Sequence, residues 1–275
     1  MTAKKLIKSV IPALMVLAFN CAIVSGAYAA VFSSKNGEYT VEVDSDFSME
    51  AGKAHYKVKD ESGEIISKFE TDLSPIALMP LNNGKRIIGF YGGVGQTVVV
   101  TQVRFYSMKG ELIGKYGIFA TGTGGQDISE NDRYYVYSWW NDKKSGIDLF
   151  DTQTGKKVWS KTFEKLVKGV KISGDGQWIV TMLSKGKSKE IYLLDYEGNL
   201  KWSGSIKASN DCSITSINED GSLFEATENK MVYNEKDGYM HRTLVKKTVY
   251  ANEDGEVKIE KIINPPPQKT QNKSH

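Results

Sequence analysis

Two stretches of the chain, IDLFDTQTGKKVWSKTF (147–163) and IYLLDYEGNLKWSGSIK (191–207), follow one pattern. In each, a largely apolar segment ends at an Asp, and a short turn with a Gly follows. A second segment, in which side chains alternate in polarity, carries a Trp four residues after that Gly. Alternation with a period of two predicts β-strands, and the Asp and Gly predict a tight turn between them. Each stretch is therefore predicted to be a β-hairpin, and the pair indicates an internal repeat.

The hairpin pattern occurs five times along the chain. Its turn glycines are spaced 47, 45, 43 and 57 residues apart, at Gly63, Gly110, Gly155, Gly198 and Gly255. A second series of turns, mostly of the Asn-Gly or Asp-Gly type, interleaves with the first, at Gly37, Gly84, Asp132, Gly176 and Gly221. Each unit is therefore predicted to hold two hairpins and four strands, A to D. The longer last step indicates an insertion in the fifth unit, around 229–243.

A repeat of about 45 residues with four strands is typical of a β-propeller. We predict an all-β fold, a propeller of five four-stranded blades over residues 30–262. The N-terminal strand VFSS (31–34) is expected to join the last blade, because closure removes exposed sheet edges. The Gly-rich stretches YGGVGQ (91–96) and TGTGGQD (121–127) lack the Lys and Ser/Thr of a phosphate loop and are expected to be loops.

Three motifs resemble those of known propeller families. ISGDGQWIV (172–180) resembles the turn of WD40-like and TolB-like propellers, and the two opening stretches resemble the repeat of pyrroloquinoline-quinone-type propellers. The similarity covers nearly all of 31–261, but only units three and four carry the full pattern. It implies a propeller of the bacterial envelope in which Trp159 and Trp202 pack between blades. It implies no activity, because enzymes, receptors and scaffolds share this fold.

The two ends of the chain differ from the repeats. Residues 1–29 have the form of a signal peptide, with Lys4, Lys5 and Lys8 before an apolar run and a cleavage site at Ala27-Tyr28-Ala29. The mature protein is thus expected to begin at Ala30 and to be periplasmic or secreted. The polar stretch 263–275 carries three of the six prolines and is expected to be a disordered tail.

Composition excludes several classes of function. The formal charge is +3 and the signal segment carries three Lys and no acidic residue, so the mature chain is near neutral (3 − 3 = 0), which disfavours a nucleic-acid binder. Only Cys212 remains after cleavage, so no intrachain disulfide is expected. The chain contains no HxH, HExxH or CxxC motif and no calcium-binding sequence of the D-x-D-x-D-G type. Asp151 and Asp195 are expected to cap their turns. We therefore expect no cofactor and no metal.

Strand order places the loops on two faces. The A–B and C–D turns lie on one face, and the more variable B–C and D–A loops lie on the other, where binding function is expected. The candidate binding residues on that face are Tyr91, Trp139, Trp140, Lys143, Lys144, Lys185 and Lys187. Trp139 and Trp140 are expected to point to opposite faces of a strand, so they cannot both be core, and one of them is expected to be exposed at the B–C edge near Tyr91 as a platform for a sugar or peptide. The lysines predict a basic sector, together with Lys165, Lys168 and Lys189.

We predict a non-enzymatic binding or scaffolding module that is monomeric and has no membrane span after signal cleavage. Its partner is expected to be a protein, or an anionic glycan or lipid. One alternative is a five-bladed propeller enzyme, a glycan hydrolase or lyase with a carboxylate pair in the central funnel. Another is a repeat module of a cell-surface adhesin. Converging carboxylates in the funnel favour the enzyme, and an apolar or basic rim favours the binder.

Overall fold

The computed structural model describes residues 27–46, 53–94, 98–118, 120–185, 188–208, 212–234 and 238–250. They form five antiparallel sheets, each built from strands that follow one another along the chain. Sheet 1 contains β1 (Ala27–Ser33), β2 (Thr40–Asp46), β3 (Ala54–Lys59) and β4 (Ile65–Thr71). Sheet 2 contains β5 (Ala77–Pro80), β6 (Arg86–Val94), β7 (Val98–Ser107) and β8 (Leu112–Gly117). Sheet 3 contains β9 (Gly122–Ile128), β10 (Tyr134–Trp140), β11 (Ser145–Asp151) and β12 (Lys156–Phe163). Sheet 4 contains β13 (Val167–Ile172), β14 (Trp178–Lys185), β15 (Ser188–Asp195) and β16 (Leu200–Lys207). Sheet 5 contains β17 (Cys212–Ile217), β18 (Leu223–Asn234) and β19 (Tyr239–Tyr250).

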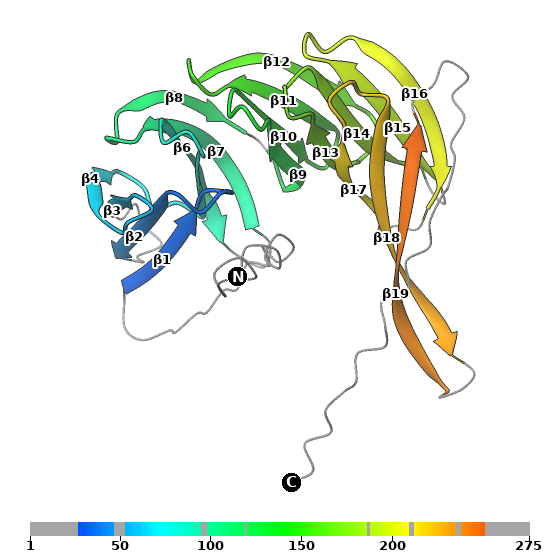
Figure 1. The fold of residues 1–275 in the computed structure, drawn as a ribbon, viewed down its shortest axis with the longest axis horizontal. Helices are drawn as coiled ribbons and strands as arrows, with labels where there is room; N and C mark the ends of the chain where they lie inside the picture. Colours follow the sequence, from blue (N-terminus) through cyan, green and yellow to red (C-terminus); the bar gives the residue numbers. More distant parts are fainter. Residues whose placement is uncertain are drawn as a thin grey trace, which may run out of the picture.

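The sheets follow one another in an arc, like the blades of a propeller (Figure 1). The all-β prediction is confirmed, and four of the five sheets have the predicted four strands. The predicted fourth strand of sheet 5, after Gly255, lies outside the described residues, as do the tail and most of the signal segment. Because β1 begins at Ala27, cleavage after Ala29 would remove three of its residues and leave the others paired with β2.

The turns take the form that their residues predict. In the C–D turns, Asp195 Oδ1 accepts the backbone N–H groups of Glu197 and Asn199, and Asp151 Oδ1 accepts that of Gln153. Gly198, like the other turn glycines, has positive φ. In sheets 1 to 4 the register of the C–D pair shifts close to this turn. The capping prediction for both aspartates is therefore confirmed.

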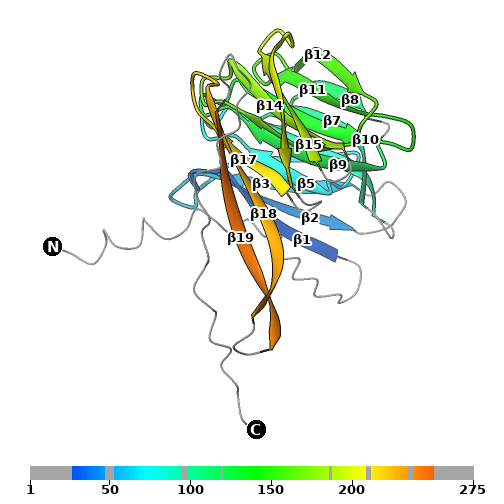
Figure 2. The same ribbon diagram turned by 90° about the vertical axis from the view of Figure 1, so that its right-hand side faces the viewer.

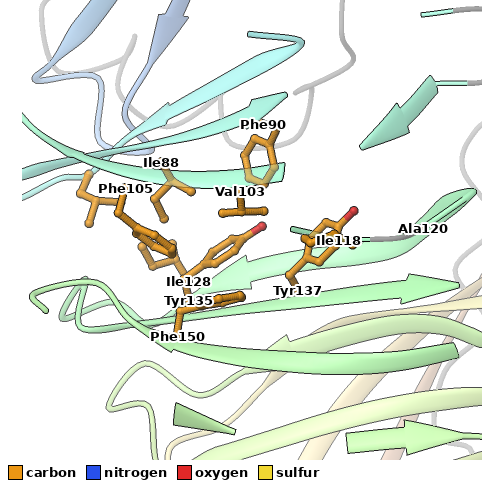
Figure 3. Close-up of a cluster of buried hydrophobic side chains, with 11 residues drawn as sticks. Ile88, Phe90, Val103, Phe105, Ile118, Ala120, Ile128, Tyr135, Tyr137 and Phe150 are labelled. Atoms are coloured by element: carbon orange, nitrogen blue, oxygen red, sulfur yellow. The ribbon is translucent and has the colours of Figure 1, made fainter. Parts of the chain in front are cut away.

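The apolar core consists of four clusters, one between each pair of neighbouring sheets. Figure 3 shows the cluster between sheets 2 and 3, where Phe105 and Phe150 from the two sheets lie 5.4 Å apart between ring centroids. Sheets 2 to 4 are therefore buried on both faces. Adjacent residues such as Ile87 and Ile88, or Ile179 and Val180, are all fully buried.

The two end sheets bury only one face. In β3 the burial alternates strictly, and the outward side of sheet 1 carries an ion pair of Lys59 with Glu42 (2.6 Å). Nδ1 of His55 lies 3.0 Å from the carboxylate of Glu70 on the same side. On sheet 5, buried Val245, Lys247 and Val249 alternate with half-buried residues. A polar outer face is what finishes the end of a repeat array without another repeat.

The expected closure by residues 31–34 is wrong. Val31, Phe32 and Ser33 pair with Glu42, Val41 and Thr40 of β2, within sheet 1. Among the described residues, the sheets form an arc with a gap between β1 and β18–β19 (Figure 1). Each repeat unit thus forms its own sheet from consecutive strands, and no strand is exchanged between the first and last described sheets.

Both Gly-rich stretches differ from the loop prediction. Residues 91–94 continue β6, and residues 122–127 form most of β9. Glycine is needed in β9 for close packing rather than for a turn. A Cβ on Gly124 would lie 2.4 Å from the carbonyl oxygen of Val167, and a Cβ on Gly122 would lie 2.1 Å from the ring of Trp140.

The A–B turns of all five sheets are joined by hydrogen bonds. The backbone N–H of Asn36 donates to Oδ1 of Asn82 (2.9 Å), the side chain of Asn131 donates to the carbonyl of Asp175 (3.0 Å), and the N–H of Asp175 donates to Oε2 of Glu219 (2.8 Å). Sheets 2 and 3 are joined by Asp132. These bonds are local contacts between successive units, so they hold neighbouring sheets at a fixed angle.

Asp132 lies at the turn position that glycine occupies in the other four A–B turns, with a φ of 56°. Its Oδ2 accepts the backbone N–H of Asn83 at 2.6 Å, and its Oδ1 accepts the side-chain N–H of Asn82 at 3.3 Å. The left-handed conformation costs about 1–2 kcal/mol for a residue with a Cβ. Hydrogen bonds to a charged group contribute about 1.5–3 kcal/mol. Asp132 thus offsets backbone strain with a contact to the next sheet.

Replacing Asp132 by alanine keeps the strain and removes the contact. We expect the free energy of unfolding, measured by urea denaturation, to fall by about 1.5–3 kcal/mol. Asp132→Gly removes the strain as well, so it should lose about 1 kcal/mol less than Asp132→Ala. Equal stability of the alanine variant and the wild type would show that the contact does not hold the sheets.

Candidate functional site

The most prominent feature of the B–C face is the hairpin of β18 and β19. Both strands are 12 residues long and pair throughout, from Leu223 with Tyr250 to Asn234 with Tyr239. Only the first part of β18, up to Glu228, is also paired with β17. The hairpin therefore projects well beyond the arc of sheets (Figures 1 and 2), and we call its outer part, residues 229–234 and 238–244, the arm. The insertion predicted around 229–243 is thus an extension of two existing strands.

The arm carries a group of exposed apolar side chains. The exposed fractions are 58% for Tyr233, 72% for Tyr239, 53% for Met240 and 37% for Leu244. Tyr233 and Met240 are cross-strand partners, so their side chains lie on the same face of the hairpin. Tyr239, next to Met240 in the strand, lies on the opposite face. Such side chains on a projecting element are typical of a contact surface for a partner.

The base of the arm is fixed by a buried ion pair. Nζ of Lys247 lies 2.7 Å from Oε2 of Glu228, and the two side chains are only 3% and 1% exposed. Nζ of Lys247 also donates to the carbonyl of Lys207, at the end of β16. The pair therefore connects β18, β19 and sheet 4 at the point where the arm leaves the body.

The structure places the two predicted tryptophans at the B–C end of β10. Trp139 packs partly into the core between sheets 2 and 3, with its ring against Gly146. The ring of Trp140 lies over Gly122, and its carbonyl accepts the N–H of Thr121 at 2.8 Å. Both side chains are half-buried and lie on opposite faces of the strand. The opposite orientation is as predicted, but the ring that was expected to be exposed is half-buried.

The predicted basic sector is only partly in place. Lys143 and Lys144 are exposed in the loop after β10, where Oδ1 of Asn141 accepts both backbone N–H groups. Lys165 pairs with Glu190 at 2.6 Å. Lys189 is fully buried, so it does not belong to the surface. The side chain of Lys185 and the whole of Lys187 lie outside the described residues.

Tyr91 lies in the core rather than on the surface, since only 1% of its side chain is exposed. Its hydroxyl donates to the hydroxyl of Tyr106 (3.0 Å) and lies 3.1 Å from that of Tyr56. The guanidinium of Arg104 lies 4.6 Å from the centre of the Tyr91 ring and pairs with Asp72 at the surface. The chain of hydroxyls joins sheets 1 and 2, whereas Trp139 packs between sheets 2 and 3. The structure therefore does not bring Tyr91 and the tryptophans together.

These tyrosines predict a loss of stability at high pH. Burial raises the pKa of Tyr56 to about 12 and raises the pKa of Tyr91 as well. Between pH 10 and 12 the unfolded chain loses the Tyr56 proton while the folded chain keeps it, so stability falls as the pH rises. We expect Tyr56 to remove about 2–3 kcal/mol over this range. In Tyr56→Phe the fall measured by urea denaturation should be smaller by that amount, and an equal fall in both proteins would contradict the assignment.

The opposite face carries a shallow polar hollow of about 240 Å³, which is lined by Lys35, Asn36, Asn82, Ile128, Ser129 and Glu130. Glu130 and Glu219 flank Gly174 there: Oε2 of Glu130 would lie 3.1 Å, and Oε1 of Glu219 2.2 Å, from a Cβ at that position. Glu219 is already engaged, because its other oxygen accepts the N–H of Asp175.

Among the residues that the structure describes, no three His, Cys, Asp or Glu side chains converge in a manner suited to a metal ion. The part of the chain described here also contains no helix with the length and apolarity needed to cross a membrane.

Solved structures similar to this chain are β-propeller domains or contain the same fold. Hydrazine synthase of Kuenenia stuttgartiensis aligns with a TM-score of 0.52 and 17% identity over 82% of this chain and 64% of its own. The β-propeller domain of the Trilobed protease from Pyrococcus furiosus, described as having an open velcro topology, aligns with a TM-score of 0.52 and 12% identity over 85% of this chain and 70% of its own. The β-propeller domain of Cps50 (Swd1) from Myceliophteria thermophila aligns with a TM-score of 0.47 and 12% identity over 82% and 73%.

The two likenesses with a TM-score of 0.52 identify the class of fold. No family model matches the chain, and no curated protein sequence matches it either. The chain spans about 64% of the hydrazine synthase chain that it matches, and at these identities the likeness extends to the fold alone. The chain thus has a β-propeller type of architecture. Its described sheets are arranged in an arc (Figure 1).

Proposed function

We propose that the chain is an exported β-propeller of five four-stranded blades that acts as a binding or scaffolding module. Its partner is held on the B–C face, chiefly by the arm. The observation that carries this proposal is the exposure of Tyr233, Tyr239 and Met240 on an element that projects from the body. Tyrosine is enriched among the residues that contribute most to protein interfaces.

The other exposed large apolar residues do not form a comparable group. Most of them lie near the start of the outermost strand of sheets 1 to 4, on the C–D turn face: Ile65 and Ile66, Leu112, Val158 and Leu200. Val31 lies in β1 and Tyr196 in the C–D turn of sheet 4. Single exposed apolar residues of this kind are normal on protein surfaces. The arm combines several such residues on two adjacent strands, and its buried base keeps them in place.

The chemistry of the arm favours a protein partner with an apolar recess. Aromatic and thioether side chains contribute binding through buried apolar area. Lys143 and Lys144, on the same face, extend the contact to an acidic rim on that partner. The enzyme alternative requires carboxylates that converge in the central funnel. Glu130 and Glu219 flank Gly174 at an A–B turn instead, where Glu219 accepts the N–H of Asp175.

The double variant Tyr233→Ser with Met240→Ser tests the proposal. We expect at least about a 30-fold loss in the affinity for a partner captured from the cell envelope by the mature protein, which corresponds to about 2 kcal/mol. Thermal stability should change little, because both side chains are exposed. The matched control is Leu112→Ser with Leu200→Ser, two residues of similar exposure on the other face. Equal losses in the two variants would refute the proposed role of the arm.

A further inference from the structure

The polar hollow on the A–B turn face lies where the turns of three sheets meet. Lys35 and Asn36 line it from sheet 1, Asn82 from sheet 2, and Ile128 and Glu130 from sheet 3. Its volume is about 240 Å³. Pockets for drug-sized ligands measure about 300–1,000 Å³, so this hollow suits a smaller molecule.

The wall of the hollow is fixed by hydrogen bonds within and between the turns. Oδ1 of Asn36 accepts the hydroxyl of Ser34 at 2.7 Å, and Oδ1 of Asn82 accepts the backbone N–H of Asn36 at 2.9 Å. The side-chain amide of Asn82 donates to Asp132 at 3.3 Å. These amide groups are therefore held by the turns, and a wall that is already ordered loses little conformational freedom when a ligand binds.

Two side chains of the lining carry charges that are free to meet a ligand. Lys35 and Glu130 are both exposed, and within the part of the chain that the structure describes neither side chain forms an ion pair or a hydrogen bond. Lys35 belongs to the wall from sheet 1 and Glu130 to the wall from sheet 3. A positive and a negative group therefore border the same small volume.

The negative side of the hollow is reinforced by a second carboxylate. A Cβ on Gly174 would lie 3.1 Å from Oε2 of Glu130 and 2.2 Å from Oε1 of Glu219, so these two oxygens lie close together across the glycine. Two like charges at short range favour a bound cation beside them, because a positive group offsets their repulsion. An ammonium group has the right chemistry, since its three N–H donors match carboxylate acceptors.

We infer that the hollow binds a free amino acid, with its ammonium group at Glu130 and its carboxylate at Lys35. A molecule with both charges complements both walls at once, whereas a simple anion or cation would leave one of the two charges without a partner. Ile128, which is 9% exposed, gives the lining an apolar part suited to an aliphatic side chain. The inference goes beyond the proposed function, because the hollow lies on the face opposite the arm and needs no partner protein.

Calorimetric titration of the exported protein with L-alanine, L-valine and L-leucine tests the inference. We expect at least one of the three to bind with a Kd of about 1 mM or lower. The N-acetyl derivative of that amino acid lacks the ammonium group and its amide lacks the carboxylate, so each should bind at least about tenfold more weakly. Absence of binding by all three amino acids, or equal affinity for the amino acid and its two derivatives, would overturn the inference.

Variants without the two charges connect the binding to the hollow. Lys35→Gln and Glu130→Gln should each weaken the binding at least about tenfold, and thermal stability should change little because both side chains are exposed. Lys85→Gln and Glu38→Gln are the matched controls, since these exposed residues lie in neighbouring A–B turns and do not line the hollow. Both controls should bind as the wild type does. Unchanged affinity in Lys35→Gln and Glu130→Gln, or equal losses in the controls, would show that the amino acid is not held in the hollow.

Discussion

Replacing Lys247 with alanine is expected to lower the free energy of unfolding by about 3–5 kcal/mol. Lys247 and Glu228 form a buried ion pair at the base of the arm, and Lys247 also bonds to the carbonyl of Lys207. Removal of the ammonium group leaves the Glu228 carboxylate buried without its opposite charge, which is far more costly than the loss of a surface contact. Urea denaturation of the mature protein measures the change.

The neighbouring residue provides a matched control. Lys246 points to the other face of β19, where it pairs with half-exposed Glu225, so Lys246→Ala should cost no more than about 1 kcal/mol. In the double variant Lys247→Met with Glu228→Gln the buried charges are absent. This double variant should recover a large part of the loss. Similar losses for Lys246→Ala and Lys247→Ala would mean that the buried pair does not anchor the arm.

A second large effect is expected at Gly124 in β9. A Cβ there would lie 2.4 Å from the carbonyl oxygen of Val167 and 3.1 Å from Oγ of Ser138. The nearer atom belongs to the backbone of β13 and cannot rotate away, so Gly124→Val must separate sheets 3 and 4. We expect the free energy of unfolding to fall by about 3 kcal/mol or more, at the upper end of the range for overpacking.

Gly117 at the end of β8 is the control for this change. A Cβ on Gly117 meets nothing within 4 Å, and its φ lies outside the left-handed region. Gly117→Val should therefore change the stability by no more than about 0.5 kcal/mol, measured by the same urea titration. If Gly124→Val proved equally harmless, β9 and β13 could not approach as closely as described.

The repeat could be predicted from the sequence because its signals are local. Asp195 and Gly198 determine their turn through bonds within four residues, and the same residue types recur in each unit. The openness of the arc was not predicted, because closure by residues 31–34 was expected, although the sequence carries one signal of it. In AHYKVK (54–59) apolar and polar residues alternate, whereas YYVYSWW (134–140) is apolar almost throughout. One-sided burial of the first distinguishes an end sheet from an internal sheet.

The features that the sequence could not predict depend on contacts between distant units. From the sequence, Tyr91 could serve equally well in an exposed aromatic platform. Only its hydrogen bonds to Tyr56 and Tyr106 show that it belongs to the core. Lys189 alternates with other lysines in the sequence but is buried in the fold. The B–C face was predicted correctly as the place of the fifth insertion, but its form as an extended hairpin follows from the pairing of β18 with β19.

The role of the arm is tested most directly by photo-cross-linking from single positions. A photoreactive amino acid is placed at Met240, and in a separate protein at Leu200, which has similar exposure on the opposite face. The proposal predicts that a partner in the cell envelope is cross-linked from position 240 and not from position 200. Cross-linking from position 200 with none from position 240 would contradict it and would place the binding surface on the turn face.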